Sequence, residues 1–167
     1  MYSIEKLYDR HFDSVYRYVY YRLRHVQDTE DVVASSFMKA AEKLPNFQAK
    51  QNASVRSWLF AIVRNTIIDH YRKQKHRNHE DIDSTFIADP PQQARILDCK
   101  LAYESVMKHL SILSAQQREI VLLRYHSGLR NKEIAELLGI EAKSVSSVLT
   151  KAKKTLKERK TIINPYE

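Results

Sequence analysis

The chain has 167 residues, among them only 2 glycines and 4 prolines, which favours long helices and argues against a turn-rich β fold. It carries 28 Lys and Arg residues against 20 Asp and Glu, a net charge of +8 that predicts a polyanionic partner, either nucleic acid or a membrane surface. No apolar run approaches the roughly 20 residues that cross a bilayer, the first residues lack the layout of a signal peptide, and a single cysteine excludes an internal disulfide. We therefore expect a cytoplasmic protein without membrane insertion.

Charge divides the chain into three parts. Residues 1–78 hold 14 basic and 8 acidic side chains, residues 79–100 hold 2 and 5, and residues 101–167 hold 12 and 7. The middle part contains two consecutive prolines and no helical period, which is typical of a linker. The sequence predicts an all-α protein of two small helical domains, 1–78 and 96–167, joined by a flexible acidic linker at 79–95.

Three helices are expected in the first domain. Apolar residues recur every three or four positions from Leu7 to Leu23, which is the period of an amphipathic helix. A second helix is predicted from near Asp28 to Leu44, because acidic residues favour the positive end of a helix dipole and a proline follows the apolar run. The third helix, at about 54–75, has apolar residues at helical spacing and a strongly basic tail.

The second domain is predicted to begin with a helix at 94–110 and to continue as a helix-turn-helix. Gly139 supplies the positive φ angle that ends the middle helix. The buried face of that helix is marked by Ile134, Ala135, Leu137 and Leu138. The last helix can enter a DNA major groove, and a helical hairpin with a solvated basic face is the alternative. Its exposed side carries short polar and basic groups, namely Lys143, Ser144, Ser146, Ser147, Thr150 and Lys151.

Three separated stretches resemble one protein family. Residues 28–40 resemble the core-polymerase-binding helix of bacterial sigma factors, and residues 58–72 resemble the promoter minus-ten recognition helix. Residues 117–119 and 133–140 resemble the domain that reads the minus-thirty-five element. Because the chain has only these two domains and a short linker, it is similar to the extracytoplasmic-function (ECF) group of the sigma-70 family.

Several positions depart from the family pattern. Ser114 stands where the family usually has proline, and serine serves equally well as a helix N-cap. Arg130 replaces the usual capping Ser or Thr three residues before Glu133, so we expect the capping box to be lost and Asn131 to cap the helix instead. Residues 34–36 are less polar than the corresponding part of the polymerase-binding helix.

The resemblance implies three sets of binding residues. The polymerase-binding set consists of Asp28, Asp31, Val32, Ser35, Phe37 and Lys39. The minus-ten set, which forms a pocket for an extruded base and lines the path of the melted strand, consists of Phe47, Gln48, Gln51, Asn52, Arg56, Arg64, Asn65, Arg72 and Lys73. The minus-thirty-five set consists of Arg118, Arg130, Lys143, Ser144, Ser146, Ser147, Thr150, Lys151 and Lys154. Trp58 is expected to be a core residue beneath the minus-ten loop.

These sets imply a sigma factor that binds core RNA polymerase, directs it to specific promoters and helps to open the DNA. Its DNA partners are the duplex promoter and the melted non-template strand. Many family members are held inactive by an anti-sigma factor, and the sequence leaves open whether this chain has one. The alternative is a stand-alone helix-turn-helix regulator that binds duplex DNA without polymerase. We expect no enzyme activity, metal or cofactor, because the sequence lacks clustered carboxylates and a nucleophile with a base.

Overall fold

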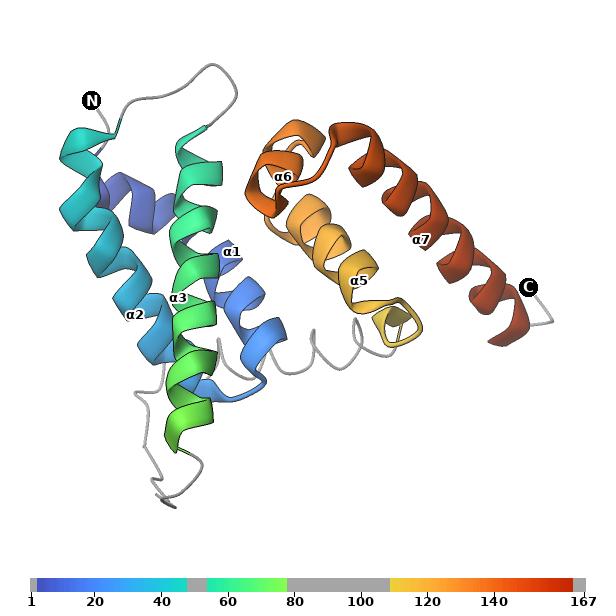
Figure 1. Ribbon diagram of the computed structural model, residues 1–167, viewed down its shortest axis with the longest axis horizontal. Helices are drawn as coiled ribbons and strands as arrows, with labels where there is room; N and C mark the ends of the chain where they lie inside the picture. Colours follow the sequence, from blue (N-terminus) through green and yellow to red (C-terminus); the bar gives the residue numbers. More distant parts are fainter. Residues whose placement is uncertain (1–2, 48–53, 78–108, 164–167) are drawn as a thin grey trace. The chain divides into compact units, whose positions relative to one another are not determined.

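The computed structural model describes residues 3–47, 54–77 and 109–163, and every regular element in these ranges is helical (Figure 1). This confirms the all-α prediction. The chain divides into two compact units, Met1–Cys99 and Lys100–Glu167. The predicted linker at 79–95, and all but the end of the predicted helix at 94–110, lie outside the described residues. No helix in the described ranges combines the length and apolarity needed to cross a membrane.

The first unit is a bundle of three helices. They are α1 (Ile4–Leu23), α2 (Val26–Lys43) and α3 (Val55–Arg77), with the short 3-10 turn η1 (Leu44–Asn46) after α2. Each of the three helices packs against the other two. α2 and α3 lie side by side and run in opposite directions, because the start of α2 faces the end of α3 (Figure 1).

The core of this bundle is formed by aliphatic and aromatic side chains from α1, α2 and α3. Tyr18 meets the ring of Phe60 edge-on, with centroids 5.4 Å apart. Burial raises the pKa of Tyr18 to about 12. Each large side chain buried here stabilises the bundle by about 1.5–3 kcal/mol. The largest fully buried side chains of this unit are Val15, Tyr18, Val19, Leu59, Phe60, Val63 and Ile67.

A tight connection joins α1 to α2. Arg24 adopts a left-handed conformation with φ 57°, and its N–H donates to the carbonyl of Tyr20 at 2.9 Å. His25 is the N-cap of α2, since its Nδ1 accepts from the N–H of Asp28 at 3.3 Å. α2 therefore begins at Val26, two residues before the start that the sequence predicted near Asp28. A histidine is not a usual N-cap, so the acidic residues behind it were the stronger signal.

The second unit contains the predicted helix-turn-helix. It consists of α5 (Ala115–Val121), the π-helical turn η2 (Leu122–His126), α6 (Asn131–Leu138) and α7 (Ala142–Ile163). α5 and α6 both pack on α7. The core side chains are Ile120, Leu122, Leu123, Leu129, Ile134, Val145, Leu149 and Ala152.

The turn between α6 and α7 is centred on Gly139. Its φ is 65°, and the following N–H, from Ile140, donates to the carbonyl of Ala135 at 3.0 Å, which closes the end of α6. The predicted role of Gly139 is confirmed. Ala135 is buried as predicted, whereas Leu137 and Leu138 are only half-buried, so the buried face of α6 is narrower than its sequence indicates.

The two predicted N-caps of this unit have different outcomes. Ser114 forms a full capping box, because its Oγ accepts from the N–H of Gln117 at 3.2 Å and its own N–H donates to Gln117 Oε1 at 2.9 Å. Arg130, not Asn131, is the N-cap of α6. A capping box has two hydrogen bonds, and the prediction that both are lost was wrong for one of them, because Glu133 Oε2 still accepts from the Arg130 N–H at 2.8 Å. A guanidinium has no acceptor to supply the other half.

Candidate functional site

The predicted polymerase-binding residues divide into a surface set and a buried set. Asp31 is exposed, and Ser35 and Lys39 are partly exposed, on the side of α2 away from α1. Val32 is only 3% exposed and Phe37 only 6%. The Phe37 ring packs against the ring of Tyr8 at 4.9 Å. Val32 and Phe37 therefore pack within the bundle, and their assignment to the polymerase contact stays a prediction.

The sequence prediction omitted the most exposed apolar side chain of α2. Met38 is 67% exposed. It follows Asp31 by seven residues, so both lie on one outer face of the helix, together with exposed Ala34 and Ala41. An unbranched apolar side chain between small residues is well suited to contact with another helix. The sequence did carry a signal for this contact, because Met38 is an apolar residue on the otherwise polar side of the predicted α2 helix.

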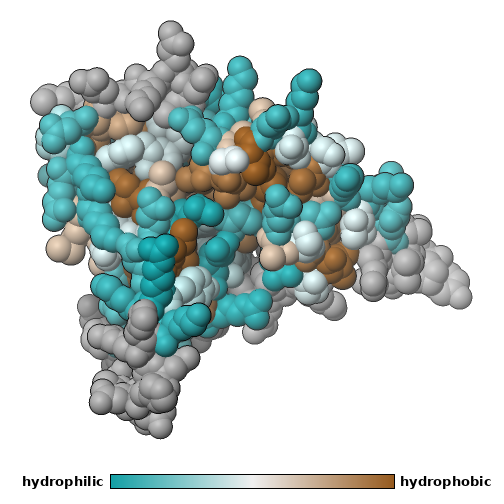
Figure 2. Space-filling view, in the orientation of Figure 1, coloured by the Kyte–Doolittle hydropathy of each residue, from teal (hydrophilic) through white to brown (hydrophobic). Residues whose placement is uncertain are grey.

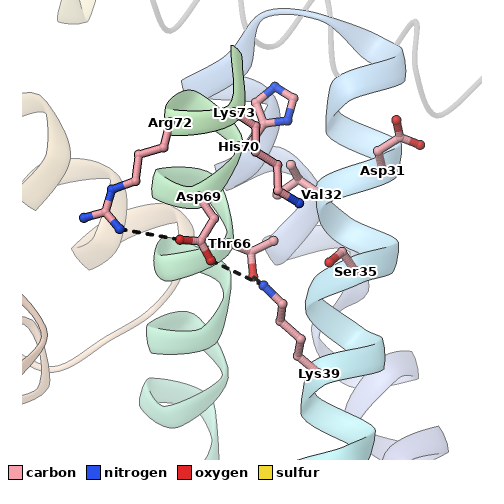
Figure 3. A pocket seen from close by; sticks show the side chains of 9 residues that line it. All are labelled: Asp31, Val32, Ser35, Lys39, Thr66, Asp69, His70, Arg72 and Lys73. Atoms are coloured by element: carbon pink, nitrogen blue, oxygen red, sulfur yellow. Dashed lines mark hydrogen bonds and ion pairs between the residues drawn. The ribbon is translucent and has the colours of Figure 1, made fainter. Parts of the chain in front are cut away.

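Charged side chains gather at a hollow of about 360 Å³ between α2 and α3 (Figure 3). In the view of Figure 2, hydrophilic residues dominate the surface over the C-terminal half of α3. The sequence assigned the α2 members to polymerase and the last two α3 members to DNA, and the structure places both sets at one hollow. The lining residues are Asp31, Val32, Ser35, Lys39, Thr66, Asp69, His70, Arg72 and Lys73.

Asp69 lies between two cations of this hollow. Lys39 Nζ is 3.6 Å from Asp69 Oδ2, and the Arg72 guanidinium is 3.8 Å from Asp69 Oδ1 (Figure 3). Lys39 Nζ also donates to Thr66 Oγ1 at 3.3 Å. Because Lys39 is partly exposed and Asp69 and Arg72 are exposed, each ion pair contributes about 0–1 kcal/mol. The arrangement orients Lys39 and Arg72 more than it stabilises the bundle.

Asp28, also in the predicted polymerase set, faces α3. Its Oδ2 lies 3.6 Å from His70 Nε2 and accepts from Gln74 Nε2 at 3.4 Å. The same oxygen is 3.4 Å from His25 Nδ1. Asp28 thus joins the start of α2 to the end of α3, which is a structural role.

The predicted minus-ten residues on α3 do not share one face. Asn65 and Arg72 are exposed and seven residues apart, so they lie on one outer face about two helical turns from each other. Arg56 and Arg64 are half-buried, and their charges affect the pKa values of two α1 side chains, His11 and Tyr18 respectively. Burial, together with the charges of Arg56 and Arg10, lowers the pKa of His11 to about 4. Lys73 lines the hollow.

The aromatic residues on either side of the predicted minus-ten loop lie together. The rings of Phe47 and Trp58 are 4.8 Å apart at 42°, and both side chains are half-buried. Trp58, predicted as a core residue beneath this loop, is only half-buried, and its ring packs on that of Phe47. Gln48, Gln51 and Asn52 lie outside the described residues.

In the second unit, the predicted reading face of α7 is exposed at Lys143, Ser144, Ser147 and Lys151. Ser146 is also exposed, but its hydroxyl donates to the carbonyl of Ala142 at 3.2 Å. The Thr150 hydroxyl donates to the Ser146 carbonyl at 3.0 Å. The face is therefore less polar toward a partner than its sequence indicates.

The predicted phosphate contacts have different surroundings. Arg118 is half-buried and donates from Nη2 to the Leu113 carbonyl at 3.1 Å, so part of its guanidinium is used within the unit. Arg130 is exposed and pairs with Glu133 at 3.3 Å. Lys154 is exposed beside Glu158 at 3.8 Å.

Two contacts of this unit involve residues outside the predicted minus-thirty-five set. Asn131 Nδ2 donates to Ser146 Oγ at 3.0 Å, from the start of α6 to α7. Lys153 Nζ lies 5.7 Å from the ring centre of Tyr125, a distance suited to a cation–π contact. Neither pair has a short-range sequence signal. In the part of the chain that the structure describes, no three His, Cys, Asp or Glu side chains are placed to hold a metal ion.

Comparison with protein families gives two matches. The model of Sigma-70 region 2 matches residues 7–77, and the model of Sigma-70, region 4 matches residues 103–156. The first range spans the described bundle, and the second includes the helix-turn-helix. Their order along the chain is the one predicted from the sequence motifs.

Curated relatives and solved structures agree with these matches. The ECF RNA polymerase sigma factor SigL of Mycobacterium tuberculosis is 30% identical over 153 residues, covering 90% of this chain and 85% of SigL. YlaC of Bacillus subtilis, an RNA polymerase sigma factor, is 29% identical, covering 95% and 92%. BldN of Streptomyces coelicolor, an ECF RNA polymerase sigma factor, is 29% identical. The match covers 90% of this chain but only 58% of the length of BldN.

Two solved structures share the fold. CnrH, solved in complex with the cytosolic domain of CnrY, has a TM-score of 0.65 at 22% identity, covering 98% of this chain and 89% of CnrH. The sigma factor RpoE of Bartonella quintana, in complex with the anti-sigma factor NepR, has a TM-score of 0.63 at 22% identity, covering 92% and 94%.

Proposed function

The chain belongs to the ECF group of the sigma-70 family and directs RNA polymerase to promoters, and from that premise we propose how its two units divide the work. The first unit binds core polymerase through α2 and the minus-ten DNA through α3. The second unit reads the minus-thirty-five element through α7. The site residues within each unit are part of this proposal.

The polymerase-binding surface is the outer face of α2. It combines exposed Met38 with Asp31 and Ser35, and Lys39 lies at its border with the hollow. An apolar anchor surrounded by polar groups is the usual composition of an energetically important contact. The exposure of Met38 is the observation that carries the proposal, because a regulator acting without polymerase has no need for this surface.

Energetics explain why the polymerase is needed. Opening about ten base pairs costs on the order of 14 kcal/mol at roughly 1.4 kcal/mol per step. Stacking a captured base on an aromatic ring returns about 1–3 kcal/mol. The Phe47–Trp58 pair can support one or two such bases, and Asn65 and Arg72 can hold the strand that follows. The polymerase must supply the remainder.

The second unit anchors the complex upstream. Exposed Lys143 and Ser144 lie in the first turn of α7, where a reading helix approaches base edges. A good bidentate base contact discriminates by about 1–3 kcal/mol, and short serine side chains give less. Exposed lysines such as Lys151 and Lys154 bind phosphates and make the affinity dependent on salt.

Gel filtration with purified core polymerase tests the proposal. The wild-type chain should co-elute with core and support run-off transcription from a genomic fragment library. Met38→Asp should weaken the complex at least about tenfold, because a charge would replace the apolar anchor. Arg17→Asp, which places the same side chain at an exposed site of α1, is the matched control. Failure of the wild type to co-elute would favour the stand-alone regulator, and full binding by Met38→Asp would remove the role of α2.

We also propose an anti-sigma factor as a second partner, acting in the cytoplasm where the polymerase works. CnrH and RpoE were solved with CnrY and NepR, respectively. An inhibitor of this kind would cover the outer face of α2 and compete with polymerase for Met38. Isolation of the tagged chain from its own cells, followed by displacement with excess core polymerase, would detect it. A co-purified inhibitor that core does not displace would contradict the shared surface.

A further inference from the structure

We propose that Asn131 is a positioning residue for the DNA-reading helix and acts through Ser146. This inference rests on the proposed minus-thirty-five function of the second unit. Asn131 is the first residue of α6, and Ser146 lies in the second turn of α7. Their side chains are joined by a hydrogen bond of 3.0 Å between Asn131 Nδ2 and Ser146 Oγ.

The hydrogen-bond network fixes the direction of this contact. A serine hydroxyl has a single proton to donate. Ser146 Oγ directs that proton to the carbonyl of Ala142 at 3.2 Å, so it accepts from Asn131 rather than donating to it. In this arrangement the amide of Asn131 presents its NH₂ group to Ser146.

The hydrogen bond joins the start of α6, which lies at the end of that helix opposite the Gly139 turn, to α7. At one end of α6, the Gly139 turn leads directly into α7. At the other end, the side chain of Asn131 is hydrogen-bonded to Ser146 of α7. A link at each end of α6 restrains both the angle and the rotation of α7. Recognition of base edges requires side chains to be held within about 0.5 Å, and residues outside the contact surface supply that restraint.

The same geometry argues that neither side chain reads DNA directly. The Ser146 hydroxyl already accepts one hydrogen bond and donates another within the unit. Asn131 Oδ1 is buried without a hydrogen-bond partner among the described residues and Nδ2 is bound to Ser146, so the amide is directed into the unit. The predicted reading role of Ser146 is thereby changed to a supporting one. Lys143, Ser144 and Ser147 remain as the exposed residues around it.

A double-mutant cycle in the holoenzyme tests the inference. A promoter selected in the run-off assay is compared with a library of single-base changes in its minus-thirty-five element. Asn131→Ala and Ser146→Ala should each reduce discrimination about two- to tenfold, the range for one lost hydrogen bond. The double variant should lose no more than either single variant, because both changes remove the same contact. The exchanged pair, Asn131→Ser with Ser146→Asn, should restore most of the discrimination.

Two further readouts separate positioning from other roles. The salt dependence of binding should stay unchanged in Asn131→Ala, whereas loss of a phosphate contact would lower the slope by about one. Lys132→Ala, at the exposed neighbouring position, should match the wild type. Additive losses, no loss, or a changed salt slope would each overturn the inference.

A reading-face variant distinguishes this inference from the function on which it rests. If Ser147→Ala and Lys151→Ala alter minus-thirty-five binding while Asn131→Ala does not, only the positioning role fails. If none of the three has an effect, the assignment of α7 to the minus-thirty-five element fails as well. Thermal unfolding of each full-length variant checks that the unit still folds.

Discussion

At the scale of single residues, His11 is a buried side chain whose pKa lies far from its usual value. It is buried in α1, and burial, reinforced by the charges of Arg56 and Arg10, lowers its pKa from 6.5 to about 4. His11 is therefore neutral at pH 7. Since the unfolded chain takes up the proton more readily, this residue contributes stability that is complete above pH 6.5 and is lost as the pH falls toward 4.

An NMR titration of the His11 ring measures this directly. We expect its signal, assigned from its absence in His11→Gln, to remain that of the neutral ring down to about pH 5 and to titrate near pH 4. Between pH 6.5 and 4, the free energy of unfolding should fall less in His11→Gln than in the wild type, by at most about 3 kcal/mol. A titration midpoint near 6.5 would show that the ring is solvated or that the Arg56 charge lies elsewhere.

Individual residue roles were predictable where a local pattern carries them. Ser114 and Gln117 form a capping box because Ser-x-x-Gln is a short-range signal. The role of Phe37 was not predictable in the same way. Its resemblance to a polymerase-binding motif selected it, whereas its packing on Tyr8 from another helix places it inside the bundle. Long-range packing decides burial, and a motif does not report it.

At the scale of elements, α6 and α7 were the most predictable, because apolar spacing and one glycine define both helices and the turn. The π-helical turn η2 was not predicted, since its wider hydrogen-bond pattern depends on how Leu122 and Leu123 pack in the core. The start of α2 was displaced because an unusual cap, His25, precedes the acidic residues. Periodicity locates a helix well and its ends less well.

Gly139 gives this scale a direct test. A Cβ at this position would meet no atom within 4 Å, so only the φ of 65° opposes a side chain. Gly139→Ala should therefore cost about 1–2 kcal/mol of stability, and Gly139→Asn should cost less because asparagine tolerates this conformation. Differential scanning calorimetry of the full chain measures both. Equal costs for Ala and Asn would indicate that something other than backbone conformation limits this position.

At the scale of the whole molecule, charge and motif order predicted two helical units and their sequence in the chain. They did not predict the hollow between α2 and α3, where Lys39 meets Thr66 from 27 residues away. Side chains assigned from the sequence to two different partners share this hollow. Only the packing of the bundle brings them together. The predicted polymerase-binding and DNA-binding residues form separate sets in the sequence, but some of them lie next to each other in the folded unit.

We propose that the first unit opens the DNA and that the second unit anchors the complex upstream. Holoenzymes carrying Asn65→Ala or Lys151→Ala should be compared on a duplex promoter and on the same promoter melted in advance over the minus-ten region, with Lys132→Ala as the control. We predict that Asn65→Ala loses about five- to hundredfold in run-off yield on the duplex, as expected for one lost base contact, and recovers most of it on the melted template. Lys151→Ala should lose a few-fold on both templates, because its upstream contact is needed in either case. Recovery of Lys151→Ala by melting, with no recovery of Asn65→Ala, would contradict the assignment of opening and anchoring to these two units.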